Sequence, residues 1–424
     1  MSSSTLPNNN DAQKITAGFL NTDWTPRELP AGTTTQNIVL RTRDGAATGG
    51  ALYQPAHKSD TVVCIMHPRE FMACHYLIPD ITQAGYAAWS QWPRSVGNDL
   101  RLEHEIALFD VAAAMERLRT EGFKRIILLG NSGGSGLYSL YMQQASLNPA
   151  ARILKTPGGR PTHLDILNMI QADGLVLVAP HPGQGALLMG CIDPSITDED
   201  DAFSTDPTLD PFSPENGYDP KTKSARYSPE FVKKYREAQV ARVNRLDNLA
   251  KTLIDERMSA RARLKAGAAG KRDKQLASHS QIITIWRTDA DLNCFDLSLD
   301  PSDRKLGSLW GNNPLVSNLG SVGFARLCSP ESWLSTWSGL SSNALLEKTA
   351  PAITQPTLLI EYTGDQACFP SIIKEIYDSL GASNKSHERV RGDHHGRSLT
   401  PDEEPGRYQA GRLICNWLTA NFPQ

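Results

Sequence analysis

Five short stretches of the chain are mostly apolar without alternating apolar and polar positions. They occupy residues 61–66, 86–91, 125–129, 175–179 and 357–362. Such runs are typical of strands that are buried on both faces of a parallel sheet. Between the second and third runs, residues 103–121 place apolar side chains on one helical face. This strand–helix–strand alternation predicts an α/β fold with right-handed crossovers.

The beginning of the chain follows a different pattern. Residues 37–55 resemble two strands joined across Asp44-Gly45, which predicts an N-terminal hairpin. The residues before it, 1–34, have neither the basic start nor the apolar core of a secretory signal. We therefore expect 1–34 to be an N-terminal tail.

The alternation stops after residue 179 and resumes only at 357. Ser228-Pro229-Glu230 is a good helix start, with a capping hydroxyl, proline in the first turn and an acid at the positive end. A helical pattern continues from there to about residue 268, and an unbroken helix of that length would span roughly 55–60 Å. Such a helix would extend past a single domain unless it were bent, folded into a pair or used in oligomer contacts. We interpret 184–345 as a largely helical cap inserted into a core formed by 35–183 and 346–424.

Composition narrows the classes of partner. Apolar residues make up 40% of the chain and charged residues 21%, and the formal net charge is -3. This balance gives no electrostatic reason to expect nucleic acid or an anionic membrane as a partner. The sequence contains no run of about 18 apolar residues, which is the length that a membrane-spanning helix needs. The seven cysteines are odd in number and form no C-x-x-C pair, which favours reduced thiols and a cytoplasmic protein that acts on a small molecule.

The strongest chemical signal is Gly130-Asn131-Ser132-Gly133-Gly134. The motif follows the apolar strand at 125–129 and precedes a stretch that can form a helix. A serine nucleophile needs a sharp strand-to-helix turn flanked by small residues, and the next helix directs its first amides at negative charge on the substrate. A phosphate-binding loop would have the spacing G-x-x-x-x-G-K-[ST], which is absent here. Ser132 is therefore predicted to be a nucleophile.

A serine hydroxyl needs a base, and the base needs an orienting acid. Asp365 follows the last buried strand, and His394 and His395 come shortly before the final helix. Ser132, an acid and a histidine thus occur in the chain order found in α/β hydrolases. Asp393 and Glu361 are alternative acids.

These motifs resemble the α/β-hydrolase family, whose late motifs commonly read G-D after one strand and G-x-x-H after the next. The resemblance covers roughly 35–183 and 346–424. Counted from Gly392, the third residue is His395, so the resemblance implies His395 as the base, with His394 as the alternative. The strand expected before the histidines, 386–391, is polar and would have to lie at the sheet edge.

The resemblance also implies an oxyanion hole made from two backbone amides. One belongs to Gly133, directly after the nucleophile, and the other comes from the loop after the strand at 61–66. That loop reads His67-Pro68-Arg69-Glu70, where the family usually has His-Gly. By position, Arg69 would supply the second amide, with Glu70 as the alternative. His67 is interpreted as a residue that braces the loop.

Residues near these loops could contact a substrate. The candidates are Phe71, Trp92, His181 and Trp333, although large aromatic side chains at such spacing are as often part of the core. The chain has no metal-binding motif and no dinucleotide-binding motif, so neither a metal nor an organic cofactor is expected.

Together these observations predict a serine hydrolase that cleaves a carboxylic ester of a small, apolar or aromatic molecule through an acyl-enzyme. Thioesters, amides, lactones and carbon–carbon bonds remain open, because the same triad can cleave them. A hydrolase-like receptor that binds a ligand without turnover is the alternative from another class.

Overall fold

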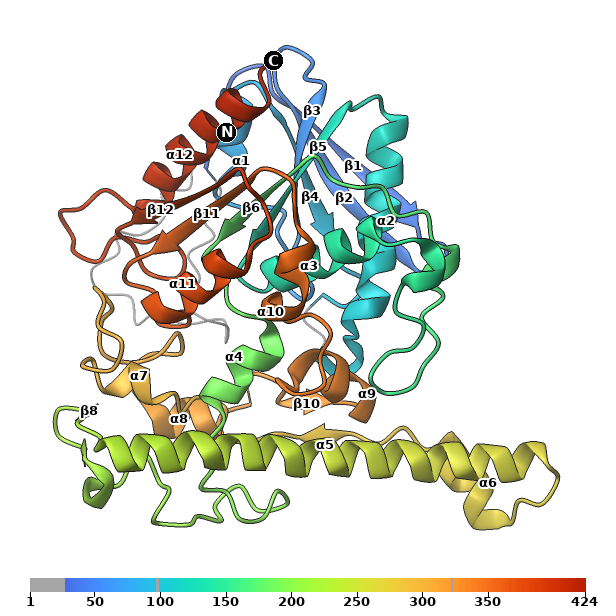
Figure 1. Ribbon diagram of the computed structural model, residues 1–424, viewed down its shortest axis with the longest axis vertical. Helices are drawn as coiled ribbons and strands as arrows, with labels where there is room; N and C mark the ends of the chain where they lie inside the picture. Colours follow the sequence, from blue (N-terminus) through green and yellow to red (C-terminus); the bar gives the residue numbers. More distant parts are fainter. Residues whose placement is uncertain (1–26, 97–98, 322) are drawn as a thin grey trace, which may run out of the picture.

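The computed structural model describes residues 27–96, 99–321 and 323–424. An eight-stranded sheet lies at its centre (Figure 1). In spatial order, its strands are β1 (Thr34–Arg41), β2 (Ala47–Gln54), β4 (Ala87–Trp92), β3 (Thr61–Ile65), β5 (Arg125–Asn131), β6 (Gly174–Val178), β11 (Thr357–Tyr362) and β12 (Lys385–Val390). β2 pairs antiparallel with both β1 and β4, and the remaining neighbours are parallel. The mostly parallel sheet and the hairpin before it are confirmed, while residues 1–26 of the predicted tail lie outside the described ranges.

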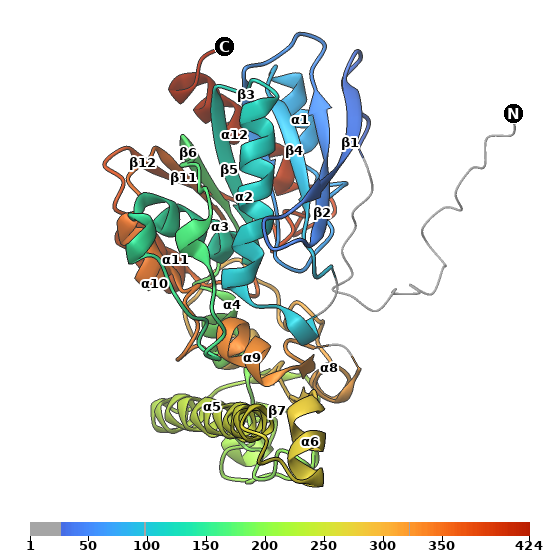
Figure 2. The same ribbon diagram turned by 90° about the vertical axis from the view of Figure 1, so that its right-hand side faces the viewer.

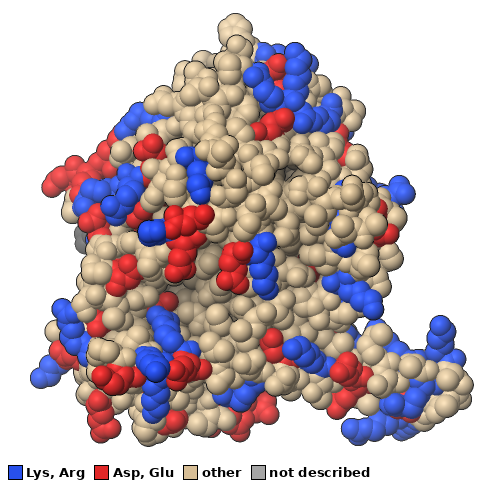
Figure 3. All heavy atoms as spheres, in the orientation of Figure 1, with Lys and Arg blue, Asp and Glu red and all other residues tan. Residues whose placement is uncertain are grey.

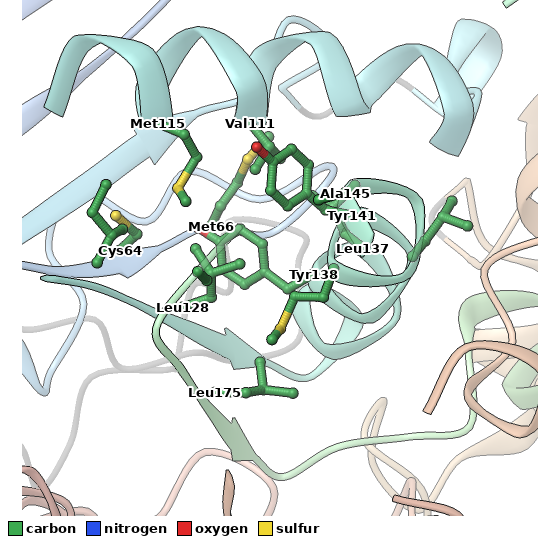
Figure 4. Close-up of a cluster of buried hydrophobic side chains, with 14 of the residues drawn as sticks. Cys64, Met66, Val111, Met115, Leu128, Leu137, Tyr138, Tyr141, Ala145 and Leu175 are labelled. Atoms are coloured by element: carbon green, nitrogen blue, oxygen red, sulfur yellow. The ribbon is translucent and has the colours of Figure 1, made fainter. Parts of the chain in front are cut away.

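The central strands are apolar at most positions because both faces of the sheet are covered. Val62 and Cys64 of β3 belong to one apolar cluster, and Val63 and Ile65 belong to the other. The first cluster includes side chains of α2 (His104–Thr120), α3 (Gly133–Ser146) and α11 (Pro370–Ser379). The second includes side chains of α1 (Ile78–Gln83) and α12 (Gly406–Asn421). Figure 4 shows part of the first cluster, where Met115 of α2 and Tyr138 of α3 lie beside the strand residues Cys64 and Leu128.

The polar strand predicted before the two histidines is β12, which forms the edge of the sheet beyond β11. Most of its side chains are half-buried. The edge position explains the composition, because one side of an edge strand pairs with the sheet and the other meets solvent.

The elements between β6 and β11 lie below the carboxyl ends of the strands (Figures 1 and 2). They are mainly helices, with two small two-stranded sheets, and they have apolar clusters of their own. The helices are α4 (Gln184–Cys191), α5 (Pro229–Lys265), α6 (Lys271–Ser278), α7 (Leu292–Phe295), α8 (Pro314–Leu319) and α9 (Pro330–Ser332), and the short strands are β7 (Tyr218–Asp219), β8 (Ser224–Ala225), β9 (Ile283–Thr284) and β10 (Leu327–Cys328). The short helix α10 (Leu346–Thr349) follows them and packs against α3 of the core. Helices α4 to α9 and these short strands lie in the segment 184–345, which we call the cap. The boundaries of this segment and its role as a cap stay predictions.

The long helix α5 is unbroken over 37 residues. The Ser228 hydroxyl caps it by accepting a hydrogen bond from the Phe231 amide at 3.1 Å. Its buried side chains, such as Val243 and Leu246, pack into the cap core. Its far end projects past the core together with α6 (Figure 1), and Lys and Arg side chains gather there (Figure 3). A role for this end in oligomer contacts stays a prediction.

Within the described ranges, no helix combines the length and apolar character needed to cross a membrane.

Candidate active site

Ser132 lies at the turn between β5 and α3, with φ 52° and ψ -120°. A non-glycine residue in such a conformation costs about 1–3 kcal/mol, and a strained serine at this turn is the geometry of a nucleophile elbow. The turn is tight enough to exclude side chains on both sides. A Cβ at Gly130 would lie 2.7 Å from the Ser135 amide nitrogen, and one at Gly134 would lie 2.2 Å from the Met66 carbonyl oxygen. The glycines of the motif therefore permit the close packing of α3 against β5 and the end of β3.

Three side chains from distant parts of the chain form a continuous hydrogen-bonded line. His394 Nε2 lies 2.9 Å from Ser132 Oγ, and His394 Nδ1 lies 2.8 Å from Asp365 Oδ2. Asp365 follows β11 and His394 follows β12, so both reach the carboxyl edge of the sheet where β5 ends. This is the arrangement in which a histidine can take a serine proton while a carboxylate orients the ring.

Both oxygens of the Asp365 carboxylate have hydrogen-bond partners. Oδ1 accepts hydrogen bonds from the amides of Ala367 at 2.7 Å and Cys368 at 3.1 Å, which leaves Oδ2 for His394. The alternative acids face elsewhere. Glu361 contacts side chains of β12, and Asp393 Oδ1 accepts hydrogen bonds from amides of its own loop. Of the three candidate acids, the structure brings Asp365 to the histidine.

The expectation that His395 contacts the serine is corrected, because its neighbour His394 occupies that place. The reason lies in the loop: Asp393 Oδ1 accepts the amides of His395 at 3.0 Å and Arg397 at 2.9 Å. This turn directs the His394 side chain to Ser132, and the His395 ring packs edge-on against that of His394 at 5.1 Å.

The surroundings of His394 and His395 shift the pKa values of the two side chains in opposite directions. Burial lowers the pKa of His394, but the adjacent Asp365 carboxylate outweighs burial and holds this pKa above the ordinary value of 6.5. Burial, together with the positive charge that His394 can carry, lowers the pKa of His395 well below its ordinary value. A histidine paired with a carboxylate is stabilised in its charged form, as a base that receives a proton must be.

The loop after β3 differs from the predicted oxyanion hole. The amides of Arg69 and Glu70 donate to His67 Nδ1 at 3.2 and 3.0 Å. They therefore point at the His67 ring, which corrects the prediction that either amide is directed at the substrate. The bracing role predicted for His67 is confirmed by these two bonds. Gly133 begins α3, so its amide is among the first of the helix and has no intrahelical acceptor.

The Arg69 side chain has contacts of its own, apart from those of its backbone amide. It is buried, its Nε lies 2.7 Å from Asp99 Oδ1, and its guanidinium lies over the Trp337 ring. Its distance to the Glu70 carboxylate is 3.9 Å. The cation is thus balanced mainly by Asp99, and burial raises the pKa of the Glu70 carboxyl at the cavity wall.

A small cavity of about 70 Å³ adjoins Ser132 and His394. His181 lines it, and burial lowers the pKa of this histidine to about 3. Contact between His181 and a substrate stays a prediction. Several other residues line the cavity that were not predicted from the sequence as substrate contacts, namely Met72, Asn131, Gln184, Leu187, Leu309 and Phe324. Gln184 and Leu187 could have been found from the helix that follows His181-Pro182-Gly183, whereas no sequence signal marks Leu309 and Phe324 of the cap.

The predicted aromatic contacts are corrected, because none of the three lines this cavity. Phe71 is 55% exposed and its ring lies 6.1 Å from that of Trp92. Trp333 is fully buried in the cap core, where its indole nitrogen donates to Asp247 at 2.8 Å. It is a structural residue of the cap.

A larger hollow of about 420 Å³ lies within the cap and is lined by residues such as Phe203, Phe212 and Leu315. None of its described lining residues is a histidine, cysteine or serine, and none belongs to the line of Ser132, His394 and Asp365. Across the part of the chain that the structure describes, no group of three or more His, Cys, Asp or Glu side chains could hold a metal ion.

No protein-family model and no curated protein matches the chain. Among solved structures, it is similar to DcsB in complex with its substrate analogue, with 12% identity, coverage of 92% of this chain and 100% of that chain, and a TM-score of 0.46. It is also similar to the esterase domain of a Rhodothermus marinus protein, with 10% identity, coverage of 91% and 98%, and a TM-score of 0.42. The α/β hydrolase GrgF from Penicillium sp. sh18 has 13% identity, coverage of 92% and 100%, and a TM-score of 0.45.

These similarities are remote, and the features that define the fold are within the chain itself. The sheet is mostly parallel with helices on both faces, and the strained serine sits between β5 and α3. The acid and the histidine follow later strands in the order that the fold requires. The chain therefore has the α/β-hydrolase fold.

Proposed function

We propose that this chain is a serine hydrolase that cleaves a carboxylic ester of a small molecule through an acyl-enzyme on Ser132. The observation that carries the proposal is the line from Ser132 Oγ through His394 to Asp365, with distances of 2.9 and 2.8 Å. His394 takes the serine proton, Ser132 attacks the carbonyl carbon, and His394 then protonates the leaving alcohol. Water, activated by the same histidine, releases the acid.

The small volume of the cavity beside Ser132 favours a substrate with a small acyl group. Ordinary ligand pockets have volumes of about 300–1,000 Å³, whereas the space beside Ser132 is about 70 Å³. Leu187, Leu309 and Phe324 supply apolar side chains to its lining. Esters with short acyl chains fit this space best, and larger ones would require the cap to move.

Thioesters, amides, lactones and carbon–carbon bonds are alternative substrates for the same three residues. A receptor of the same fold would bind its ligand without turnover, and a complete serine–histidine–aspartate line argues against that role, since ligand binding alone does not need it.

The test is labelling of the purified protein with a fluorophosphonate probe, followed by identification of the labelled peptide. We expect a label on Ser132 in the wild type and none in Ser132→Ala. Esters of increasing acyl length, with matched thioesters and amides, would then define the substrate class. A folded wild type that stays unlabelled at Ser132, or an S132A variant that is labelled equally, would contradict the proposal.

The pH dependence of turnover follows from His394. Its protonated form cannot accept the Ser132 proton, so activity is lost as pH falls through the pKa of this histidine. Because Asp365 holds that pKa above 6.5, we expect kcat/KM to rise with pH and to reach half its maximum above pH 6.5. A profile measured between about pH 5 and pH 9 checks this, since kcat/KM reports groups of the free enzyme. A midpoint clearly below 6.5 would rule out His394 as the base in this environment.

A further inference from the structure

His67 does more than brace the loop after β3, because the bracing bonds determine where its proton lies. Nδ1 accepts hydrogen bonds from two amides, at 3.2 and 3.0 Å, so it cannot carry a hydrogen. A neutral imidazole has one N–H, which must then be on Nε2. Burial and the nearby Arg69 charge lower the pKa of His67 well below its ordinary value, so the ring stays neutral and keeps this single donor.

The Nε2 atom lies beside the first residue of α3. A Cβ built on Gly133 would be only 2.5 Å from it, so the imidazole fills the space that a side chain at Gly133 would need. His67 also lines the cavity at Ser132. The Nε2–H of His67 thus lies next to Gly133, the residue directly after the nucleophile, in the wall of the same cavity.

This side is where an oxyanion forms in this fold. β3 lies directly next to β5, with Ile65 paired to Leu129, so the residues after β3 come alongside the elbow. The second donor normally comes from the backbone of this loop. Here Pro68 has no N–H, and the next two amides are already bonded to His67.

We infer that the second donor of the oxyanion hole is the His67 side chain, through its Nε2–H, together with the amide of Gly133. This inference rests on the proposed function. When Ser132 Oγ bonds to the carbonyl carbon, its proton moves to His394 and the C=O π electrons move to the carbonyl oxygen. That oxygen accepts hydrogen bonds from Gly133 and His67, and no proton leaves His67. When the C=O bond re-forms, the bond from the carbonyl carbon to the ester oxygen breaks. The leaving oxygen takes the proton from His394 and departs as the alcohol.

Two substitutions separate this role from bracing. In His67→Asn, the side-chain oxygen can take the place of Nδ1 and accept the loop amides, but the distal donor is lost. In His67→Gln, the side-chain amide can reach the position of Nε2 and donate, but the acceptor for the loop amides is lost. An oxyanion donor makes H67N the damaging change, whereas a residue that only braces the loop makes H67Q the damaging one.

The experiment measures kcat and KM of both variants with a short-chain ester, after thermal unfolding has shown that they fold. We expect H67N to lower kcat by about 10²–10³-fold with little change in KM, as removal of one oxyanion donor does. H67Q should retain at least ten times more of the wild-type kcat than H67N. Equal loss in both variants, greater loss in H67Q, or a nearly unchanged kcat in H67N would overturn the inference.

A second measurement uses the wild type and does not depend on the folding of variants. In protein labelled with ¹⁵N-histidine, a trifluoromethyl ketone that adds to Ser132 should move the His67 Nε2–H proton signal downfield. An adduct that leaves this signal unchanged would overturn the inference. If the wild type were not labelled by fluorophosphonate at all, the proposed function would fail first; a labelled wild type with an unaffected H67N fails the inference alone.

Discussion

Replacing His394 with alanine is expected to lower kcat by about 10⁵–10⁶-fold, the loss seen when a triad histidine is removed. Replacing the adjacent His395 is expected to lower it by less than tenfold. His394 contacts both Ser132 Oγ and Asp365 Oδ2, whereas His395 contacts the edge of the His394 ring. Removing His395 therefore takes away a packing contact of the His394 ring, whereas removing His394 takes away the base itself.

The two alanine variants are matched controls for each other, because both remove one buried or nearly buried imidazole from the same loop. Initial rates with a short-chain ester and the rate of fluorophosphonate labelling would be measured for both. If H395A lost as much activity as H394A, or if H394A remained active, the assignment from the geometry would be wrong.

Much of the fold could be predicted because the relevant information is local. Strands such as β3 and β5 are apolar at consecutive positions, and alternate side chains pack on opposite faces of the sheet. Glycines around Ser132 similarly signal a tight turn, because that turn leaves no space for a Cβ at Gly134. Because parallel strands end at one edge of the sheet, a serine, an acid and a histidine that each follow a strand could be expected to meet there.

The choice between the two histidines could not be predicted from spacing. It depends on the turn that Asp393 forms with the amides of His395 and Arg397, and a shift of one residue in that turn would exchange their places. The same limit applies to the loop after β3. The sequence shows His67-Pro68-Arg69, but only the folded loop shows that the Arg69 amide points at the histidine ring.

Contacts between residues far apart in the chain account for the other places where the structure differs from the sequence-based prediction. Trp333 is an aromatic residue of the cap, and its role depends on Asp247, 86 residues away, which accepts its indole N–H. Leu309 and Phe324 reach the cavity only because the cap folds back onto the sheet edge. No periodicity or motif within either segment carries that information.

Replacing Asp365 with asparagine is expected to lower kcat by about 10⁴-fold, and the structure indicates why the loss should be so large. The Ala367 and Cys368 amides both donate to one oxygen of the carboxylate. In D365N these amides would keep the side-chain oxygen, so the NH₂ group would face His394 Nδ1. His394 would then have to accept at Nδ1 and carry its proton on Nε2, where it could not take the proton of Ser132.

The matched control is Glu361→Gln, which changes the other buried acid at the end of β11 by the same single atom. Glu361 contacts His387 and Arg389 of β12 and does not contact the triad histidine. The kcat of the Glu361→Gln variant should therefore stay within a few-fold of the wild-type value. D365N should also shift the midpoint of the pH profile downward, because the carboxylate that raises the pKa of His394 is gone. Comparable losses in both variants, or an unchanged midpoint in D365N, would mean that Asp365 contributes to folding and not to the orientation and charge of the base.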